Sequence, residues 1–222
     1  MGLLARAVRP LEVRRLGLMP YAEAAALQAE LHERRATGDA VDTLLLLEHP
    51  HVYTIGRRGS ASDVLWNAEA LARRGVEVVE ADRGGQVTYH GPGQLVGYPI
   101  IDLSPGADLV AYVRRLEDVL MGALAFFGIT AERDPANTGV WVRGAKIGAI
   151  GVRVTRSVTK HGFALNVAPD LSYFAGIVPC GIADRGVTSM AVELGARAPG
   201  LDAVAESVEE RFIDTFGYGA AA

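Results

Sequence analysis

The strand-like segments of this 222-residue chain come in runs and do not alternate strictly with helices. Apolar or alternating stretches predict strands at residues 11–18, 43–56, 76–82, 94–100, 138–142, 146–154 and 157–167. Capping residues and apolar periodicity predict helices at residues 21–36, 67–74, 108–127 and 202–216. Strands in runs favour an α+β fold over a doubly wound α/β fold. We expect one domain over residues 1–222, because no stretch has the composition of a linker.

A single cysteine, Cys180, narrows the chemistry that the chain can support. One thiol cannot form an internal disulfide, so we expect a reducing compartment, the cytoplasm. Cysteine-rich zinc and iron–sulfur sites are excluded, and His49 and His51, separated by one proline, do not form a metal motif. We therefore expect no metal. The longest apolar runs are too short to span a membrane, and a net charge of −4 implies no general attraction to nucleic acid.

Lysine is rare in this chain and is a candidate partner for the thiol. Of 22 basic residues, only Lys146 and Lys160 are lysines. A thiol reacts as the thiolate, which a nearby ammonium favours, although a lone cysteine is more often a small buried apolar residue. The residues alone leave the two lysines as equal candidates. They also allow His90 or His161 to serve Cys180 as a base.

The segment from residue 83 to residue 94, R-G-G-Q-V-T-Y-H-G-P-G-Q, concentrates glycine and polar side chains. It matches neither a dinucleotide fingerprint nor a phosphate-binding P-loop. Glycine allows a backbone to approach a ligand closely, so we predict that this segment forms the wall of a ligand site, with a plain turn as the alternative. A second segment, G-A-K-I-G-A-I-G at 144–151, has small residues that leave room for an apolar ligand chain or allow close strand packing.

Four segments together resemble the lipoyl(octanoyl) transferase family. The pattern R-G-G-x-x-T-Y-H-x-x-G-Q-x-x-x-Y is present from residue 83 to residue 98, and K-I-G-A-I-G-V-R begins at residue 146. H-G-F-A-L-N-V follows at residue 161, and P-C-G-I at residue 179 precedes G-V-T-S-M at residue 186. The resemblance implies a mixed or antiparallel sheet flanked by helices, related to the fold of biotin and lipoate protein ligases.

The resemblance also implies a reaction. An octanoyl group moves from acyl carrier protein to a lysine of a lipoyl domain, with Cys180 carrying it as a thioester and Lys146 as the partner of Cys180. A thioester is already activated, so no cofactor and no ATP are expected. The family pattern places the acyl chain against fourteen residues of this sequence: Arg83, Gly84, Gly85, Gln86, Val87, Thr88, Tyr89, His90, Ala149, Ile150, Gly151, Gly162, Phe163 and Ala164.

Three other functions compete with octanoyl transfer. One is an ATP-dependent lipoate or biotin ligase of the same fold, and another is an amidotransferase that moves octanoyl between lipoyl-domain proteins. The last is a non-catalytic acyl-binding module in which Cys180 is inert. If the transferase interpretation holds, we expect a monomer. We also expect arginines such as Arg57, Arg58 or Arg153 to steer the acidic acyl carrier protein.

Overall fold

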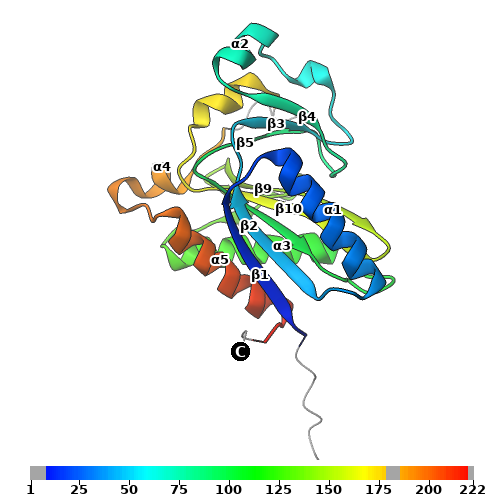
Figure 1. The fold of residues 1–222 in the computed structure, drawn as a ribbon. Coiled ribbons are helices and arrows are strands. Elements are labelled where there is room, and N and C mark those ends of the chain that lie inside the picture. The colour runs from blue at the N-terminus through cyan, green and yellow to red at the C-terminus, as the bar shows by residue number, and fades with distance from the viewer. Residues whose placement is uncertain (1–8, 179–185, 220–222) are drawn as a thin grey trace, which may run out of the picture.

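A computed structural model describes residues 9–178 and 186–219, which contain two β-sheets (Figure 1). The larger sheet has seven strands, in the order β1 (Leu11–Leu18), β2 (Asp42–Glu48), β6 (Gln94–Ile100), β10 (Val158–Asn166), β9 (Ala145–Thr155), β8 (Val140–Val142) and β7 (Glu132–Arg133). The smaller sheet has three strands, in the order β4 (Glu77–Glu80), β3 (Val52–Ile55) and β5 (Val87–His90).

Five α-helices accompany the sheets in the described part of the chain: α1 (Tyr21–Thr37), α2 (Ala68–Arg73), α3 (Leu109–Phe126), α4 (Met190–Leu194) and α5 (Leu201–Phe216). Three short 3₁₀ helices complete this part: η1 (Ala61–Asp63), η2 (Leu171–Gly176) and η4 (Gly195–Arg197).

Local sequence signals explain where the long helices begin and end. The Asp108 side chain accepts hydrogen bonds from the backbone N–H groups of Val110 and Ala111, which satisfies two donors at the start of α3. Gly38 and Gly217 end α1 and α5 in the left-handed conformation, at φ values of 87° and 70°. These local signals account for the agreement between the predicted helices and the observed ones.

The larger sheet is covered on both faces. Helices α3 and α5 bury one face, where Leu44, Leu95 and Leu165 contribute to the main apolar core. Helix α1 covers part of the other face, where Leu45 and Val96 point. Figure 1 shows the smaller sheet and α2 at one end of the larger sheet, close to the beginning of α1. The face that carries α1 therefore borders the smaller sheet at the same end.

One predicted strand proves to be two. The pattern of residues 43–56 suggested a strand that continues past Pro50, but β2 and β3 belong to different sheets. Proline cannot donate a backbone hydrogen bond, and the chain bends at Pro50 and His51 between the two sheets. His49 and His51 consequently lie in the connection and not within a strand.

The strand directions confirm an α+β fold with a mixed sheet. β1 pairs with β2 in parallel, whereas β2, β6, β10, β9, β8 and β7 pair antiparallel in that order. None of the helices in the described residues combines the length and the apolar character that crossing a membrane requires.

Candidate active site

The floor of the candidate site consists of small residues that face one another on two neighbouring strands. Gly151 pairs with Gly162, and Ala149 pairs with Ala164, across β9 and β10. A Cβ atom on Gly162 would lie 2.2 Å from the carbonyl oxygen of Gly97, which is far inside contact distance. The backbone packing therefore requires glycine at this position, and the four small residues leave space above the sheet.

A loop from the smaller sheet forms the wall above this floor. The N–H of Gly84 donates to the carbonyl oxygen of Val152 at 3.0 Å, which holds the loop against β9. The buried Arg83 guanidinium donates to the Thr54 carbonyl oxygen at 2.6 Å and to its hydroxyl at 2.7 Å. Arg83 thus fixes the loop to β3 and positions the glycines that follow it.

Two hollows meet at this wall. An inner cavity of about 50 Å³ lies between the sheets and is lined by Tyr21, Arg83, Gly84, Gly85, Thr88, His90, Tyr98, Ala149, Ile150, Gly151, His161, Gly162, Phe163 and Ala164. An outer cleft of about 620 Å³ is lined by Arg58, Gly84, Gly85, Gln86, Leu109, Val113, Ala136, Asn137, Thr138, Lys146, Ala149, Ile150, Gly151 and Val152. The two share the glycines of the loop and the middle of β9, so a ligand can extend from one into the other.

A β-bulge turns Lys146 towards this shared region. The adjacent residues Val140 and Trp141 pair with Gly148 and Lys146, so Ile147 is an extra residue in β9. Ile147 is completely buried in the core beneath α3. Because alternate residues of a regular strand share a face, Lys146 would otherwise lie on the face opposite to Ala149. The bulge therefore brings the lysine and the small-residue floor to the same side.

The surroundings of Lys146 link it to the segment that follows Cys180. Its Nζ lies 4.6 Å from the centre of the Trp141 ring, a cation–π contact. Its backbone N–H donates to Gly186 O, and its carbonyl oxygen accepts from Thr188 N, both at 3.0 Å. Cys180 itself lies outside the described residues.

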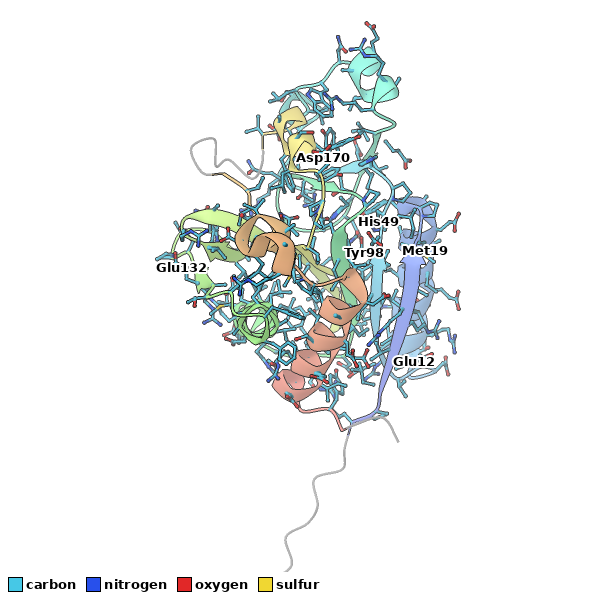
Figure 2. The ribbon with its side chains drawn as sticks, turned by 90° about the vertical axis from the view of Figure 1, so that its left-hand side faces the viewer. Glu12, Met19, His49, Tyr98, Glu132 and Asp170 are labelled. Carbon is cyan, nitrogen blue, oxygen red and sulfur yellow. The ribbon has the colours of Figure 1, made fainter. Side chains whose placement is uncertain are left out.

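Phenol and imidazole groups line the inner cavity, and His49 lies next to one of them, Tyr98. His49 Nδ1 donates to the Met19 carbonyl oxygen at 2.7 Å, and its Nε2 lies 2.8 Å from the Tyr98 hydroxyl; Figure 2 shows these three residues grouped together. Burial lowers the pKa of His49, which keeps the imidazole neutral. Burial also raises the pKa of Tyr21 to about 12 and that of Tyr98 well above its ordinary value. These imidazole and phenol groups are therefore neutral, and the Arg83 guanidinium is the charged group beside them.

The second lysine has a different role. Lys160 Nζ lies 2.9 Å from one Asp82 oxygen, and His161 Nε2 lies 2.5 Å from the other. Burial raises the pKa of Asp82, but the hydrogen bonds from His161 and Lys160 outweigh it and hold that pKa at about 2. Burial lowers the pKa of His161 despite the nearby carboxylate. The structure thus places Lys160 in an ion pair and only Lys146 in the outer cleft.

The model of the lipoyl protein ligase A/B catalytic domain matches residues 20–213. The chain belongs to this family. Among its curated relatives, an octanoyltransferase from Chloroflexus aggregans is 54% identical over 203 residues, which cover 90% of this chain and 91% of the relative.

Solved structures support the same fold for this member of the lipoyl protein ligase family. A bi-partite lipoate protein ligase from Thermoplasma acidophilum superposes with a TM-score of 0.73 at 17% identity, covering 95% of this chain and 86% of the other. A biotin protein ligase from Aquifex aeolicus superposes with a TM-score of 0.52 at 12% identity, covering 93% of this chain and 69% of the other. The expected biotin and lipoate ligase fold is confirmed.

The predicted binding residues of this ligase-family chain do not all face one space. Eleven of the fourteen line the inner cavity, and Gln86 lines the outer cleft alone. Val87 and Tyr89 point to the opposite side of β5, into the core of the smaller sheet, where the Tyr89 hydroxyl lies 2.8 Å from His51 Nδ1. Strand alternation explains this division, because Thr88 and His90 occupy the intervening positions.

Sequence reasoning missed several residues of the site. Tyr98 could have been found, because it alternates with Val96 and Ile100 along β6 and shares their face. Tyr21 had no comparable signal, since it reaches the cavity from the first turn of α1. Asn137 and Thr138 join the outer cleft from a loop that carried no motif. Across residues 9–178 and 186–219, no group of three His, Cys, Asp or Glu side chains could hold a metal ion.

Proposed function

We propose that this chain transfers an octanoyl group from acyl carrier protein to a lysine amine of a lipoyl domain, through a thioester on Cys180. The observation that carries the proposal is the position of Lys146. It faces the same side of β9 as the small-residue floor, and its backbone is paired with Val187, seven positions after Cys180. The octanoyltransferase names of curated relatives that are about as long as this chain support the same reaction.

Chain length is compatible with a Cys180–Lys146 pair. Gly186, whose carbonyl oxygen accepts from the Lys146 N–H, stands six positions after Cys180. A fully extended chain covers at most about 3.6 Å per residue. The Cα atoms of Cys180 and Gly186 are therefore separated by no more than about 22 Å. That limit is compatible with a thiol at the outer cleft, which Lys146 lines.

The transfer takes place in two acyl exchanges. The Cys180 thiolate adds to the thioester carbonyl of the donor, and the tetrahedral intermediate collapses to expel the thiolate of the carrier. The lysine amine of the acceptor then adds to the acyl-enzyme, an amide forms, and Cys180 leaves as the thiolate. Lys146 as an ammonium stabilises the Cys180 thiolate and gives its proton to the carrier thiolate that leaves. As the resulting neutral amine, Lys146 takes the proton that the attacking lysine loses.

The acyl chain lies along the floor between the two hollows. Its thioester end occupies the outer cleft near Lys146, and its hydrocarbon end passes Ala149 and Gly151 into the inner cavity. Each methylene removed from water contributes about 0.8 kcal/mol, so six methylenes contribute about 5 kcal/mol. That energy favours a medium-length chain over a short one.

The carrier protein docks beside the outer cleft. Arg58 lines the cleft, and Arg57 precedes it at an exposed position, so both can meet an acidic partner. Arg153 contributes less, because its Nε is 3.2 Å from an Asp82 oxygen. We place this reaction in the reducing cytoplasm and propose that a monomer carries it out.

Mass spectrometry of the intact protein tests the proposal. Mixing it with octanoyl acyl carrier protein should add one octanoyl group, which the Cys180→Ser variant should not retain as a thioester. The Lys146→Ala variant should form the adduct slowly. Absence of any adduct would favour a non-catalytic acyl-binding module. Full activity of Cys180→Ala together with a requirement for ATP would identify an ATP-dependent ligase instead.

Octanoylated lipoyl-domain proteins, offered as donors in place of the carrier protein, distinguish the amidotransferase. An amidotransferase would use them efficiently, whereas the proposed enzyme requires a thioester donor.

A further inference from the structure

Two buried amide side chains connect the inner cavity to the strand of Lys146. His90 Nδ1 lies 2.7 Å from Gln94 Oε1, and Gln94 Nε2 donates to Asn166 Oδ1 at 2.8 Å. Asn166 Nδ2 donates to the carbonyl oxygen of Thr188 at 3.0 Å. All four residues are at most 6% exposed, so water does not compete for these hydrogen bonds.

The carbonyl group of Thr188 determines which group donates and which accepts in each hydrogen bond from Asn166 to His90. A backbone carbonyl can only accept, so the NH₂ group of Asn166 must face Thr188 and its oxygen must face Gln94. Gln94 is then oriented with its NH₂ group towards Asn166 and its oxygen towards His90. An oxygen acceptor at His90 requires a proton on Nδ1, which leaves the lone pair of the neutral ring on Nε2.

His90 is held in this neutral form. Burial lowers the pKa of His90 well below its ordinary value, and the neighbouring His49 and Arg83 act in the same direction. The ring lines the inner cavity, and its centre is 5.7 Å from that of His49. The imidazole therefore presents a hydrogen-bond acceptor, and no proton that it could give to a ligand.

At its other end, this series of hydrogen bonds reaches Lys146 through Thr188. The Thr188 N–H donates to the Lys146 carbonyl oxygen at 3.0 Å, and the Thr188 hydroxyl lies 2.6 Å from a Glu193 carboxylate oxygen. Gln94 and Asn166 are themselves partners in the antiparallel pairing of β6 and β10. The orientation of His90 and the placement of the Lys146 backbone thus depend on the same two amides.

We propose that Gln94 and Asn166 are positioning residues for acyl transfer, which fix the proton of His90 on Nδ1 and hold Thr188 against Lys146. This role rests on the proposed octanoyl transfer. A lone pair in the cavity repels a carbonyl oxygen, whereas an N–H would attract one. Beside His90 the inner cavity therefore disfavours the thioester carbonyl, and the acyl chain enters with its methyl end first.

Nitrogen-15 NMR of histidine-labelled protein reads the proton position directly. In the wild type, His90 should show a protonated Nδ1 and an unprotonated Nε2. Asn166→Ala removes the group that orients Gln94, so the two His90 tautomers should mix. It also leaves the Thr188 carbonyl without its partner. The rate of octanoyl adduct formation on Cys180, measured with a small octanoyl thioester, should then fall roughly 10-fold.

A matched variant separates positioning from stability. Asn67 caps α2 by accepting a hydrogen bond from the Ala70 N–H, and it lines neither hollow. Asn67→Ala should lower thermal stability and leave both the His90 signals and the adduct rate unchanged. An equal loss of rate in Asn67→Ala and Asn166→Ala would reduce the effect to stability and overturn the proposal.

A second variant keeps the test decisive if Asn166→Ala does not fold. Gln94→Glu retains an acceptor for His90 and adds a negative charge, so His90 should take its second proton at a higher pH than in the wild type. A wild-type His90 protonated on Nε2, or an unchanged titration in Gln94→Glu, contradicts the proposal. The NMR result does not require acyl transfer, so a wild type that forms no adduct would refute the octanoyltransferase function alone.

Discussion

The cavity floor at Ala149 offers the sharpest test of where the acyl chain lies. Ala149 faces Ala164 on the neighbouring strand, and both line the inner cavity. Ala149→Leu adds three carbon atoms to this floor and should displace about three methylenes of an octanoyl chain. At about 0.8 kcal/mol per methylene the loss is about 2.4 kcal/mol, which corresponds to about 60-fold in kcat/KM.

The assay compares small thioesters of increasing chain length. The rate of adduct formation on Cys180 should fall about 60-fold for octanoyl and at most about 3-fold for butanoyl, because the shorter chain does not reach as far into the inner cavity. Ala72→Leu, on the exposed surface of α2, makes the same change away from the site and serves as the control. An equal loss at every chain length, or none for octanoyl, would show that the chain does not lie on this floor.

Three further predictions follow from the same geometry. Lys146→Arg should still form the Cys180 adduct but transfer octanoyl to a lipoyl domain at least about 100-fold more slowly, because arginine keeps its proton. Asp82→Asn should lower Tm near pH 6, and the difference from wild type should shrink as pH falls from about 4 to about 2, since the lowered pKa of Asp82 stabilises the fold only while the carboxylate is ionised. Gly151→Ala should lower Tm by at least about 2 °C, because its Cβ would lie 3.0 Å from Gly84 O, whereas Gly200→Ala meets no atom within 4 Å and should have little effect. Equal Tm values for the two alanine variants, or a constant Asp82→Asn difference across that pH range, would contradict this reasoning.

Much of the architecture follows from local sequence signals. The caps and the left-handed glycines specify where the long helices start and stop, and residues 11–18 form the predicted strand. The predicted connection through Pro50 is the exception, because whether two strands share a sheet depends on which partners lie beside them. The neighbouring strands of β2 and β3 come from residues that are distant in the sequence.

The site shows the same division. The alanines and glycines within 149–151 and 162–164 predict room for an apolar chain, and the structure pairs them side by side across β9 and β10. For the segment from residue 83 to residue 90, the sequence did not indicate which side chains face the cavity and which face a core. Thr88 and His90 face the cavity while Val87 and Tyr89 enter a core, because the smaller sheet has packed surfaces on both sides of β5.

The sequence by itself determined the types of residue available for chemistry: one cysteine, two lysines and the glycine-rich segments. Those residue types left the two lysines as equal candidates, and the family resemblance favoured Lys146. The tertiary structure supplies the physical distinction, since Lys160 pairs with Asp82 while the bulge at Ile147 turns Lys146 into the outer cleft. The physical reason is the range of the forces involved. Capping and backbone preferences act within a few residues, whereas strand register, and with it the direction of every side chain, depends on partners distant in sequence.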